Sequence, residues 1–393
     1  MASHKIILGI TGGIAAYKAA ELTRLLIKND FDVQIVMTES ASHFITPLTF
    51  QALSGKEVLT NLWKSNASNG MSHIELSRDY DLIVIAPASA NFLAKLTHGF
   101  TDDLLSSLCL ARVCPIAVAP SMNMHMWTNK ATQRNVSQLK KDGVLFCGPD
   151  SGEQACGDIG FGRMMDTEEL LKSIQNHLTP KILKNKKILI TSGGTIEMID
   201  DVRGITNLSS GNMGAAIANT ANSMGASVTL ITSKYQNFSE NINVIYASNA
   251  HTMHDAVLQH IKDQDIFISV AAVSDYKPKE KFKGKLKKDS LNLTLQLTPT
   301  IDILKEVGLS KNKIFKVGFA AESENLIENA QKKMKAKNLD LIVANLIHES
   351  VSLEDTKVSI IDKNNVINLP KSNKIIAAKA ILKEIAHRIN ADK

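Results

Sequence analysis

The sequence predicts an α/β protein built from two tandem, Rossmann-like domains with parallel sheets. Short apolar runs rich in β-branched residues alternate with helical patterns, and the alternation starts again after a polar, basic segment near the middle. The chain has 393 residues, 44% of them hydrophobic, and so exceeds the size at which a single core stops growing. We therefore expect two domains, residues 1–180 and 187–393.

The first domain shows its strands as buried runs separated by helical patterns. Its predicted strands are residues 5–11, 32–38, 81–88 and 115–121, and its first helix begins near Ile14. Strands that alternate with helices favour a parallel sheet covered by helices. The segment 179–187, TPKILKNKK, contains a helix-stopping proline and is the expected boundary.

The second domain repeats the alternation with different spacings. Predicted strands cover residues 187–194, 227–232, 265–272, 314–322 and 339–345. A helix is expected over about 251–262, a Lys-rich helix between the last two strands, and a C-terminal helix from about Ser372. These elements again predict a parallel sheet.

Composition excludes several classes of protein. Four cysteines without C-x-x-C spacing argue against a disulfide scaffold or a thiolate metal site. A net charge of +6, with few aromatic residues among the lysines, disfavours a nucleic-acid binder. No apolar run of roughly 18 residues occurs, and the N-terminus lacks a basic region and a cleavage site, so no membrane segment or secretion is expected. The expected location is the cytoplasm.

Glycine-rich turns open both domains. Gly12 and Gly13 directly precede the predicted helix at Ile14, where backbone N–H groups and a helix N-terminus can bind a phosphate. A tight turn without a ligand remains an alternative. The segments TGGIAAYK and SSGNMGAA both lack the G-x-G-x-x-G pattern, so a nicotinamide cofactor would rest on topology alone.

Further polar segments follow in the first domain. The loop APASANFLAKL follows a buried strand, where α/β sheets bind ligands, and Asn91 is expected to cap the next helix or contact a ligand. His73 lies in MSHIELSRDYD, Asn123 in PSMNMHMW and Cys156 in GEQACGDIGFGRMM. Taken alone, these residues have ordinary alternatives: a surface histidine, a loop or cap hydrogen bond, and an inert cysteine.

Together these segments, over about residues 4–178, resemble the homo-oligomeric flavin-containing cysteine decarboxylases, in particular the phosphopantothenoylcysteine decarboxylases. The shared features are the P-A-S-A-N loop, the P-x-M-N-x-x-M-W segment and the A-C-G flap. The resemblance implies a flavodoxin-like domain with FMN. The residues that it places around FMN are Gly12, Gly13, Ile14, Thr38, Ser40, Pro87, Ala88, Ser89 and Asn91.

The resemblance also assigns chemical roles. A flavin can oxidise the substrate thiol, which gives the electrons left by CO2 a place to delocalise. His73 would act near the flavin as a base or electrostatic partner, and Asn123 would donate its amide to the substrate carboxylate. Cys156 would return a proton, on a flap that its neighbouring glycines make mobile.

The second domain contains the segments TSGGTIEMIDDVRGITNLSSGNMG, AAVSDYKPKEKFKGKLKKD and GFAAESENLIENAQKKMKAKNLDLIVAN. The first suits phosphates and polar acyl groups held by backbone amides. The second places Asp275 after a strand end, where its carboxylate could hold Mg²⁺, and continues into a loop with clustered lysines. A lysine run is more often a solvated surface.

These segments resemble the phosphopantothenate-cysteine ligases, whose bacterial members use CTP and form an acyl-cytidylate. By resemblance, Asn207 would stabilise the acyl intermediate, Arg203 would face the anionic end of the substrate, and Lys285 would contact the triphosphate. The resemblance places further residues around the nucleotide: Ala271, Asp275, Asp302, Ile303, Phe319, Lys333 and Lys337. Ile301 is an insertion relative to the usual P-D-I-L and leaves the contact of Asp302 open.

The order of the two domains resembles the bifunctional bacterial decarboxylase and ligase family of coenzyme A biosynthesis. The implied substrates are 4'-phosphopantothenate, cysteine and CTP, and the implied assembly is a homo-oligomer, consistent with a dodecamer with dimeric ligase domains. Two rivals are a nicotinamide-dependent oxidoreductase and a non-catalytic flavin-binding regulatory subunit. The missing G-x-G-x-x-G motifs count against the first, and the presence of His73, Asn123 and Cys156 counts against the second.

Overall fold

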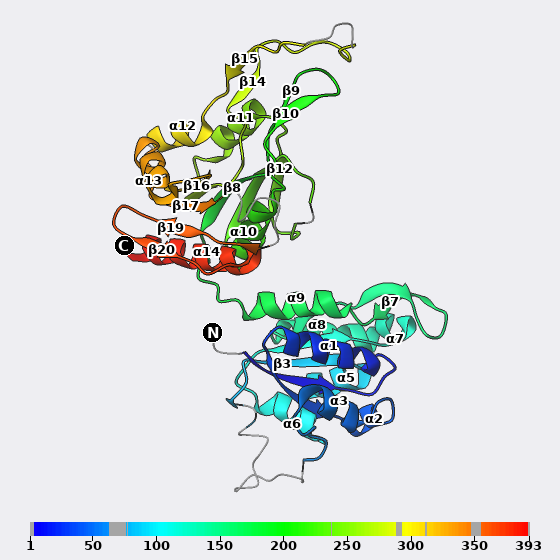
Figure 1. The fold of residues 1–393 in the computed structure, drawn as a ribbon. Helices are drawn as coiled ribbons and strands as arrows, with labels where there is room; N and C mark the ends of the chain where they lie inside the picture. The colour runs from blue at the N-terminus through cyan, green and yellow to red at the C-terminus, as the bar shows by residue number, and fades with distance from the viewer. Residues whose placement is uncertain are drawn as a thin grey trace. The chain divides into compact units, whose positions relative to one another are not determined.

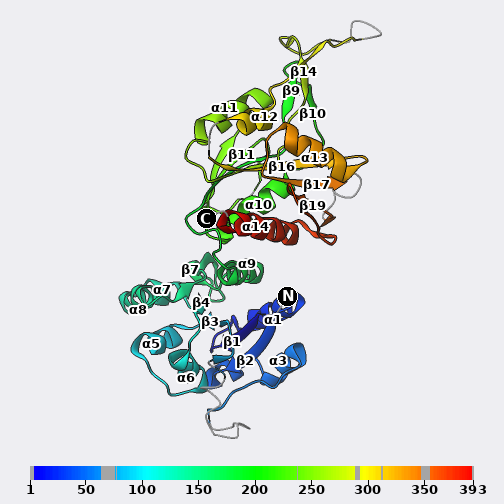
Figure 2. The same ribbon diagram turned by 90° about the vertical axis from the view of Figure 1, so that its left-hand side faces the viewer.

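The computed structural model describes residues 4–62, 76, 78–236, 238–287, 293–310, 313–346 and 355–391. It divides into two compact units, residues 1–178 and 179–393. Each unit holds one main sheet, wholly or mostly parallel, with helices on both faces, as the ribbon views show (Figures 1 and 2). No helix among the described residues is long and apolar enough to cross a membrane.

The first unit alternates strands and helices up to a hairpin and a final helix. Its elements are β1 (Lys5–Ile10), α1 (Ala16–Lys28), β2 (Asp32–Met37), α2 (Glu39–Ser42), α3 (Pro47–Ser54), β3 (Leu82–Ala88), α5 (Ala90–His98), α6 (Leu104–Ala111), β4 (Ile116–Pro120), α7 (Met124–Thr128), α8 (Lys130–Lys141), β5 (Leu145–Phe146), β6 (Asp150–Glu153), β7 (Ile159–Arg163) and α9 (Thr167–Leu178).

The first sheet has the strand order β2-β1-β3-β4-β5, and all its pairings are parallel. This 2-1-3-4-5 order is that of flavodoxin-like proteins, in which ligands bind where the order reverses, between the first and third strands. Side chains from α1, α3 and α9 cover one face of the sheet, and side chains from α5, α6 and α8 cover the other. Because both faces are covered, the strands are continuous apolar runs.

The second unit follows the same plan with more strands. Its elements are β8 (Lys187–Ser192), β9 (Ile196–Met198), β10 (Gly204–Thr206), α10 (Asn212–Ser223), β11 (Ser227–Thr232), β12 (Asn243–Tyr246), α11 (Ala250–His260), β13 (Ile266–Ser269), β14 (Tyr276–Pro278), β15 (Leu297–Pro299), α12 (Ile303–Leu309), β16 (Phe315–Glu322), α13 (Leu326–Ala336), β17 (Leu341–Leu346), β18 (Asp355–Thr356), β19 (Ser359–Ile361), β20 (Val366–Asn368), β21 (Ser372–Asn373) and α14 (Lys374–Ala391).

The second sheet has the order β12-β11-β8-β13-β16-β17-β19-β20, of which the first six strands are parallel. Counted within the unit, these six strands have the order 3-2-1-4-5-6 of Rossmann folds, with the reversal between β8 and β13. Helices α10 and α14 cover one face, and α11, α12 and α13 cover the other. The predicted fold class is therefore confirmed in both units.

Candidate active sites

The reversal point of the first sheet is held together by a buried threonine. The Thr11 hydroxyl donates to the Pro87 carbonyl oxygen at 2.7 Å and accepts from the Ser89 N–H at 3.0 Å. Thr11 is 1% exposed. These bonds join the ends of β1 and β3, so the predicted segments 12–14 and 87–89 meet at the edge where flavodoxin-like sheets bind ligands.

Gly12 is required by the close approach of the segment after β2. A Cβ atom at Gly12 would lie 2.7 Å from the Cβ and Oγ atoms of Ser40, closer than real contacts allow. The Ser40 hydroxyl lies 3.0 Å from the Thr38 hydroxyl, and Thr38 caps α2 by accepting from the Ala41 N–H. The structure thus brings Gly12, Thr38 and Ser40 together at one edge of the sheet.

Helix α1 begins at this edge without a capping side chain. Its N-cap is Ala15, and its first turn contains no acidic residue. The positive end of a helix dipole is therefore left to an external anion. Next to it, Ile14 is 64% exposed. Both features fit a phosphate-bearing cofactor.

The expectation that Asn91 caps the following helix is wrong. Ser89 is the N-cap of α5 and its hydroxyl accepts from the Phe92 N–H at 3.3 Å, whereas Asn91 lies inside the first turn and is exposed. Ser89 is the N-cap because this position directly precedes the first helical residue and has an extended backbone, as Ser89 does. Contact between Asn91 and a ligand stays a prediction.

The glycine-rich segment around Cys156 is a hairpin of β6 and β7. A Cβ atom at Gly162 would lie 2.4 Å from the Met122 carbonyl oxygen, and one at Gly160 would lie 2.2 Å from the Met124 sulfur. The Met122 N–H also donates to the Gly162 carbonyl oxygen at 2.9 Å. These glycines therefore let the hairpin lie directly against the segment that carries Asn123.

Asn123 and Cys156 meet at the tip of this hairpin. The Asn123 Nδ2 atom lies 3.2 Å from Cys156 Sγ and donates to Asp158 Oδ2 at 2.7 Å. The Cys156 thiol donates to the same carboxylate oxygen at 3.3 Å. The Asn123 side-chain oxygen accepts from the His125 N–H, so the residue also caps α7. The two predicted residues are thus brought together, while His73 lies outside the described residues.

Asp158 is a residue that sequence reasoning missed. Hydrogen bonds from the Asn123 amide and the Cys156 thiol hold the pKa of its carboxyl below the ordinary value. It remains a carboxylate at neutral pH and accepts hydrogen bonds from both side chains. Its position two residues after the cysteine was the available signal.

The second sheet carries a cavity of about 840 Å³ at its reversal point. It lies beyond the carboxyl ends of β8, β13 and β16, as expected for a Rossmann order. The predicted site residues that line it are Asn207, Ala271, Asp275, Asp302, Ile303, Phe319, Lys333 and Lys337. Most of the predicted ligase site is therefore assembled around one space.

The N-terminus of α10 faces this cavity. Gly211 is its N-cap, with φ of +78°, and provides no capping side chain. A Cβ atom at Gly214 would lie 2.2 Å from Ser192 Oγ and 2.5 Å from Ser192 Cβ, so glycine is what allows α10 to lie this close to β8. Residues 209–214 all line the cavity, and their helix dipole favours an anion there.

Two lysines and an aspartate lie on the other side of the cavity. Lys333 Nζ donates to the Phe319 carbonyl oxygen at 2.9 Å, and Lys337 Nζ lies 2.9 Å from Asp302 Oδ1. Burial lowers the pKa of the Lys333 ammonium, and Lys337 lowers it further. Asp302 is also the N-cap of α12, where it accepts from the Lys305 N–H at 3.0 Å.

Asn207 extends from the long segment after β8. Its Nδ2 atom donates to the carbonyl oxygens of Ala272 and Val273 at 3.3 and 3.1 Å. A Cβ atom at Gly194 would lie 2.6 Å from the Asn207 carbonyl oxygen, so this loop also depends on glycine. These bonds fix Asn207 at the cavity wall, close to the strand end that leads to Asp275.

Arg203 and Lys285 lie outside the residues that line the cavity. Arg203 is paired with Asp200, Nη2 to Oδ2 at 2.7 Å, and donates to the Leu286 carbonyl oxygen. Burial raises the pKa of the Asp200 carboxyl, but N–H donors from Val202, Arg203 and Leu286 and the Arg203 side chain outweigh it and hold the pKa well below normal. Lys285 is exposed.

The Lys-rich segment 279–287 after β14, which we call the Lys-rich arm, is thereby joined to the hairpin of β9 and β10. The Gly284 N–H donates to Asp201 Oδ2 at 2.8 Å, and Lys281 forms an ion pair with Asp201 at 3.0 Å. Figures 1 and 2 show β14 and β15 extending beside that hairpin. The sequence predicts a loop from Pro278 onward, but Pro278 is the last residue of β14, so the loop begins after it.

Two family models match the chain. The model described as "Flavoprotein" matches residues 1–179, and the model described as "DNA/pantothenate metabolism flavoprotein C-terminal domain" matches residues 183–389. A solved C-terminal domain of a coenzyme A biosynthesis bifunctional protein aligns with a TM-score of 0.47 and 38% identity, over 54% of this chain and 99% of that one.

Relatives cover almost the whole chain. Coenzyme A biosynthesis bifunctional proteins are 43% identical over 392 residues in Vibrio vulnificus, 41% over 396 in Bacillus subtilis and 40% over 400 in Escherichia coli. The aligned regions span 98%, 98% and 99% of this chain and 98%, 97% and 98% of the relatives. The chain therefore belongs to the family of bifunctional coenzyme A biosynthesis proteins, in which a decarboxylase domain and a ligase domain share one chain.

Proposed function

We propose that the chain performs two consecutive reactions at two separate sites. The ligase, residues 187–393, joins cysteine to 4'-phosphopantothenate through an acyl-cytidylate formed from CTP. The decarboxylase, residues 1–180, converts the product to 4'-phosphopantetheine with FMN. The observation that carries this proposal is that the two units hold unlike chemical groups. The first has an Asn-Cys-Asp cluster where the β6–β7 hairpin meets Asn123, and the second has a cavity with lysines and carboxylates at the reversal point of its sheet.

The first unit fits FMN on three counts. The uncapped N-terminus of α1 suits its phosphate, the Gly12–Ser40 approach leaves backbone N–H groups of the turn near the same edge, and Thr11 holds Pro87 and Ser89 at that edge. When bound, FMN supplies a two-electron acceptor for the substrate thiol. The residues that would hold it are Gly12, Gly13, Ile14, Thr38, Ser40, Pro87, Ala88, Ser89 and Asn91.

Asn123 binds the substrate carboxylate in this proposal. Its amide now donates to Asp158, so the Asp158 carboxylate stands where a substrate carboxylate would be bound. The two anions cannot share one amide without repulsion. Substrate binding therefore displaces Asp158 from Asn123, and the hairpin of β6 and β7 is the segment that has to shift.

Cys156 returns a proton to the decarboxylated product. Its thiol donates a hydrogen bond to Asp158, which orients the S–H group. The side chain is exposed at the hairpin tip, so it can reach a substrate without unfolding of the core. His73 is proposed to act beside the flavin, on the strength of the resemblance.

The charged and polar groups of the ligase cavity have different proposed roles. The ammonium groups of Lys333 and Lys337 and the N-terminus of α10 bind phosphates of CTP and of the pantothenate substrate. Asp275 offers a carboxylate for Mg²⁺, whose preferred ligands are oxygens. Asn207 stabilises the acyl intermediate from the wall of the cavity.

Arg203, in the turn of the β9–β10 hairpin, is proposed to act on the substrate, and Lys285, on the Lys-rich arm, is proposed to act on the triphosphate. The bonds from Asp200 and Asp201 fix this arm to the neighbouring hairpin, so the two residues move together. Arg203 would have to exchange part of its bonding to Asp200 for the substrate anion.

We also propose that the protein is cytoplasmic and works as a homo-oligomer, consistent with a dodecamer. Exposed apolar side chains support an interface at the hairpin and on α1: Ile159 is 74% exposed, Phe161 56% and Tyr17 61%. Light scattering coupled to size exclusion tests the mass of the assembly. A monomer would contradict this part of the proposal.

Cofactor and nucleotide use test the assignment of the two sites. The purified protein should show visible flavin absorbance, and heat should release FMN identified by mass. With 4'-phosphopantothenate and Mg²⁺, CTP should give pyrophosphate. An Asn207→Asp variant should lose ligation only, since the new charge repels the acyl phosphate. A nicotinamide without visible absorbance, or equal loss of decarboxylation in that variant, would refute the assignment.

A further inference from the structure

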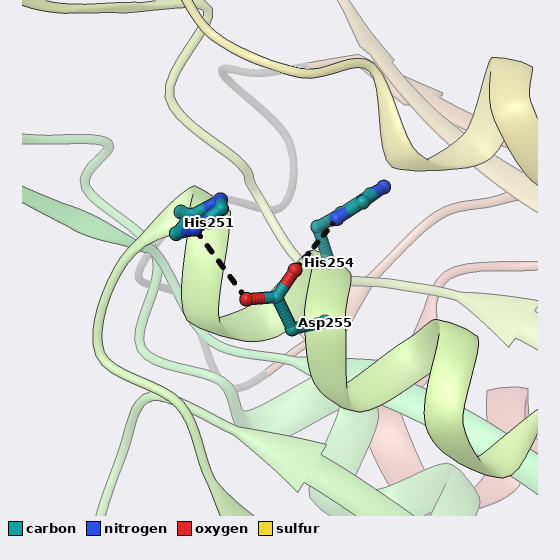
Figure 3. Close-up of side chains that lie close together, drawn as sticks. All are labelled: His251, His254 and Asp255. Atoms are coloured by element: carbon teal, nitrogen blue, oxygen red, sulfur yellow. Dashed lines mark hydrogen bonds and ion pairs between the residues drawn. The ribbon is translucent and has the colours of Figure 1, made fainter.

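Helix α11 carries a group of potential metal ligands on the face next to α12. His251, His254 and Asp255 occupy positions i, i+3 and i+4, which lie on one side of a helix. One ligand atom from each can be chosen so that all lie within 4.8 Å of one another. Figure 3 shows Asp255 between the two imidazole rings, with one carboxylate oxygen directed to each.

The distances fit a small divalent cation. His254 Nδ1 lies 3.1 Å from Asp255 Oδ1, and His251 Nε2 lies 3.5 Å from Asp255 Oδ2. Ligands at the usual zinc distances of about 2.0–2.2 Å in a tetrahedron lie roughly 3.4 Å apart. The two observed separations fall on either side of that value, each to a different oxygen of Asp255.

A second helix supplies an independent sign of a metal site. Glu306 of α12 holds His254 Nε2 at 2.8 Å through Oε2. Metal-bound histidines nearly always have their second ring nitrogen bonded to a carboxylate or carbonyl, which fixes the ring and increases its basicity. Here Glu306 orients His254, whose side chain is only 12% exposed, so that Nδ1 faces Asp255.

We propose that His251, His254 and Asp255 bind a divalent transition-metal ion of the zinc class, with Glu306 as the carboxylate that orients His254. Two imidazoles and one carboxylate suit Zn²⁺, Cu²⁺ or Ni²⁺, whereas Mg²⁺ prefers oxygen ligands alone. Three protein ligands leave a fourth position for water or an external group. None of the four residues lines the ligase cavity, so this site is separate from the proposed magnesium position at Asp275.

The position of the site links it to the cavity. Glu306 belongs to α12, and the N-cap of this helix is Asp302, which lines the cavity and contacts Lys337. An ion that fixes His254 therefore also restrains the short helix that holds Asp302. The inference rests on α11 and α12 alone and not on the proposed reactions.

Calorimetric titration of the full-length flavoprotein with ZnCl2 tests the site. The His251→Ala and Asp255→Asn variants should each lose one zinc equivalent relative to the wild type, because both side chains are well exposed and their loss leaves the core intact. His260→Ala, on the same helix but outside the group, is the matched control and should retain the wild-type stoichiometry.

The Glu306→Gln variant tests the orienting role. It should retain the stoichiometry and weaken zinc binding by about 10- to 100-fold. Absorbance of bound Co²⁺, read as the difference from the metal-free protein, should disappear in His251→Ala and remain in His260→Ala. Equal zinc stoichiometry and affinity in the wild type, His251→Ala and Asp255→Asn would overturn the proposal and leave the group as an ion-pair cluster.

Discussion

The contact of Gly214 with Ser192 gives a sharp test of how the ligase cavity is built. In Gly214→Ala, the new Cβ would lie 2.2, 2.5 and 3.2 Å from the Oγ, Cβ and Cα atoms of Ser192. Two of these atoms cannot move by a side-chain rotation. Helix α10 must therefore shift away from β8, and with it the segment 209–214 that lines the cavity.

The expected magnitude follows from two opposing effects. Overpacking a core contact costs about 1–3 kcal/mol, and the backbone-adjacent clash places this one near the upper value. Replacing glycine by alanine inside a helix returns about 1 kcal/mol. The net loss is about 2 kcal/mol, which for a domain of this size lowers its Tm by roughly 4–8 °C.

The assay uses the two activities of one chain. Gly214→Ala should raise the KM for CTP in the ligase reaction, while decarboxylation of added phosphopantothenoylcysteine stays at the wild-type rate and serves as the internal control. The double variant Ser192→Gly/Gly214→Ala moves the extra carbon from strand to helix and should restore most of the ligase activity. A single variant with unchanged KM and Tm would refute the packing argument.

Three other predictions address single groups. Cys156→Ser should keep bound flavin but stall decarboxylation at the oxidised intermediate, because a hydroxyl is a poorer proton donor than a thiol; trapped intermediate is read by mass, and full turnover would remove Cys156 from its role. Asp158→Ala should lower both the KM and the kcat of decarboxylation, since it frees the Asn123 amide and leaves the thiol unoriented; an unchanged KM would show that Asp158 does not compete with substrate. The pKa of Lys333 is lowered, so its ammonium loses its proton at a pH below the ordinary lysine pKa of about 10.4. The KM for CTP should therefore start to rise below that pH. As pH rises between the folded and the unfolded pKa of Lys333, the free energy of unfolding should increase, because the unfolded chain binds the extra proton. Lys333→Arg should remove the pH dependence of KM, and an identical profile in that variant would assign this dependence to another group.

The strands were predictable because buried parallel strands leave an unambiguous apolar signal. The runs at 5–11 and 187–194 became β1 and β8 with small changes at their ends. The strand orders were not predictable in the same way, since periodicity carries no information on which strands pair. The reversal points, and hence the positions of both candidate sites, become visible only with the pairings.

The residues of the candidate sites also differ in whether a local sequence pattern reveals them. Motif residues such as Asn123 and Cys156 were found because a short segment identifies them, and the structure brings them within 3.2 Å. Asp158 was missed because its role depends on a hydrogen bond across the hairpin tip. Arg203 was expected to face a substrate, yet it pairs with the buried Asp200 and donates to the Leu286 carbonyl oxygen, a contact across 83 residues that no local pattern reveals.

The most direct test of two reactions in one chain is a mass-spectrometric assay of the purified protein. It is supplied with 4'-phosphopantothenate, cysteine and Mg²⁺, with and without CTP. We expect 4'-phosphopantetheine only when CTP is present. Accumulation of the cysteine adduct without its decarboxylated product, or conversion that does not require CTP, would contradict the account.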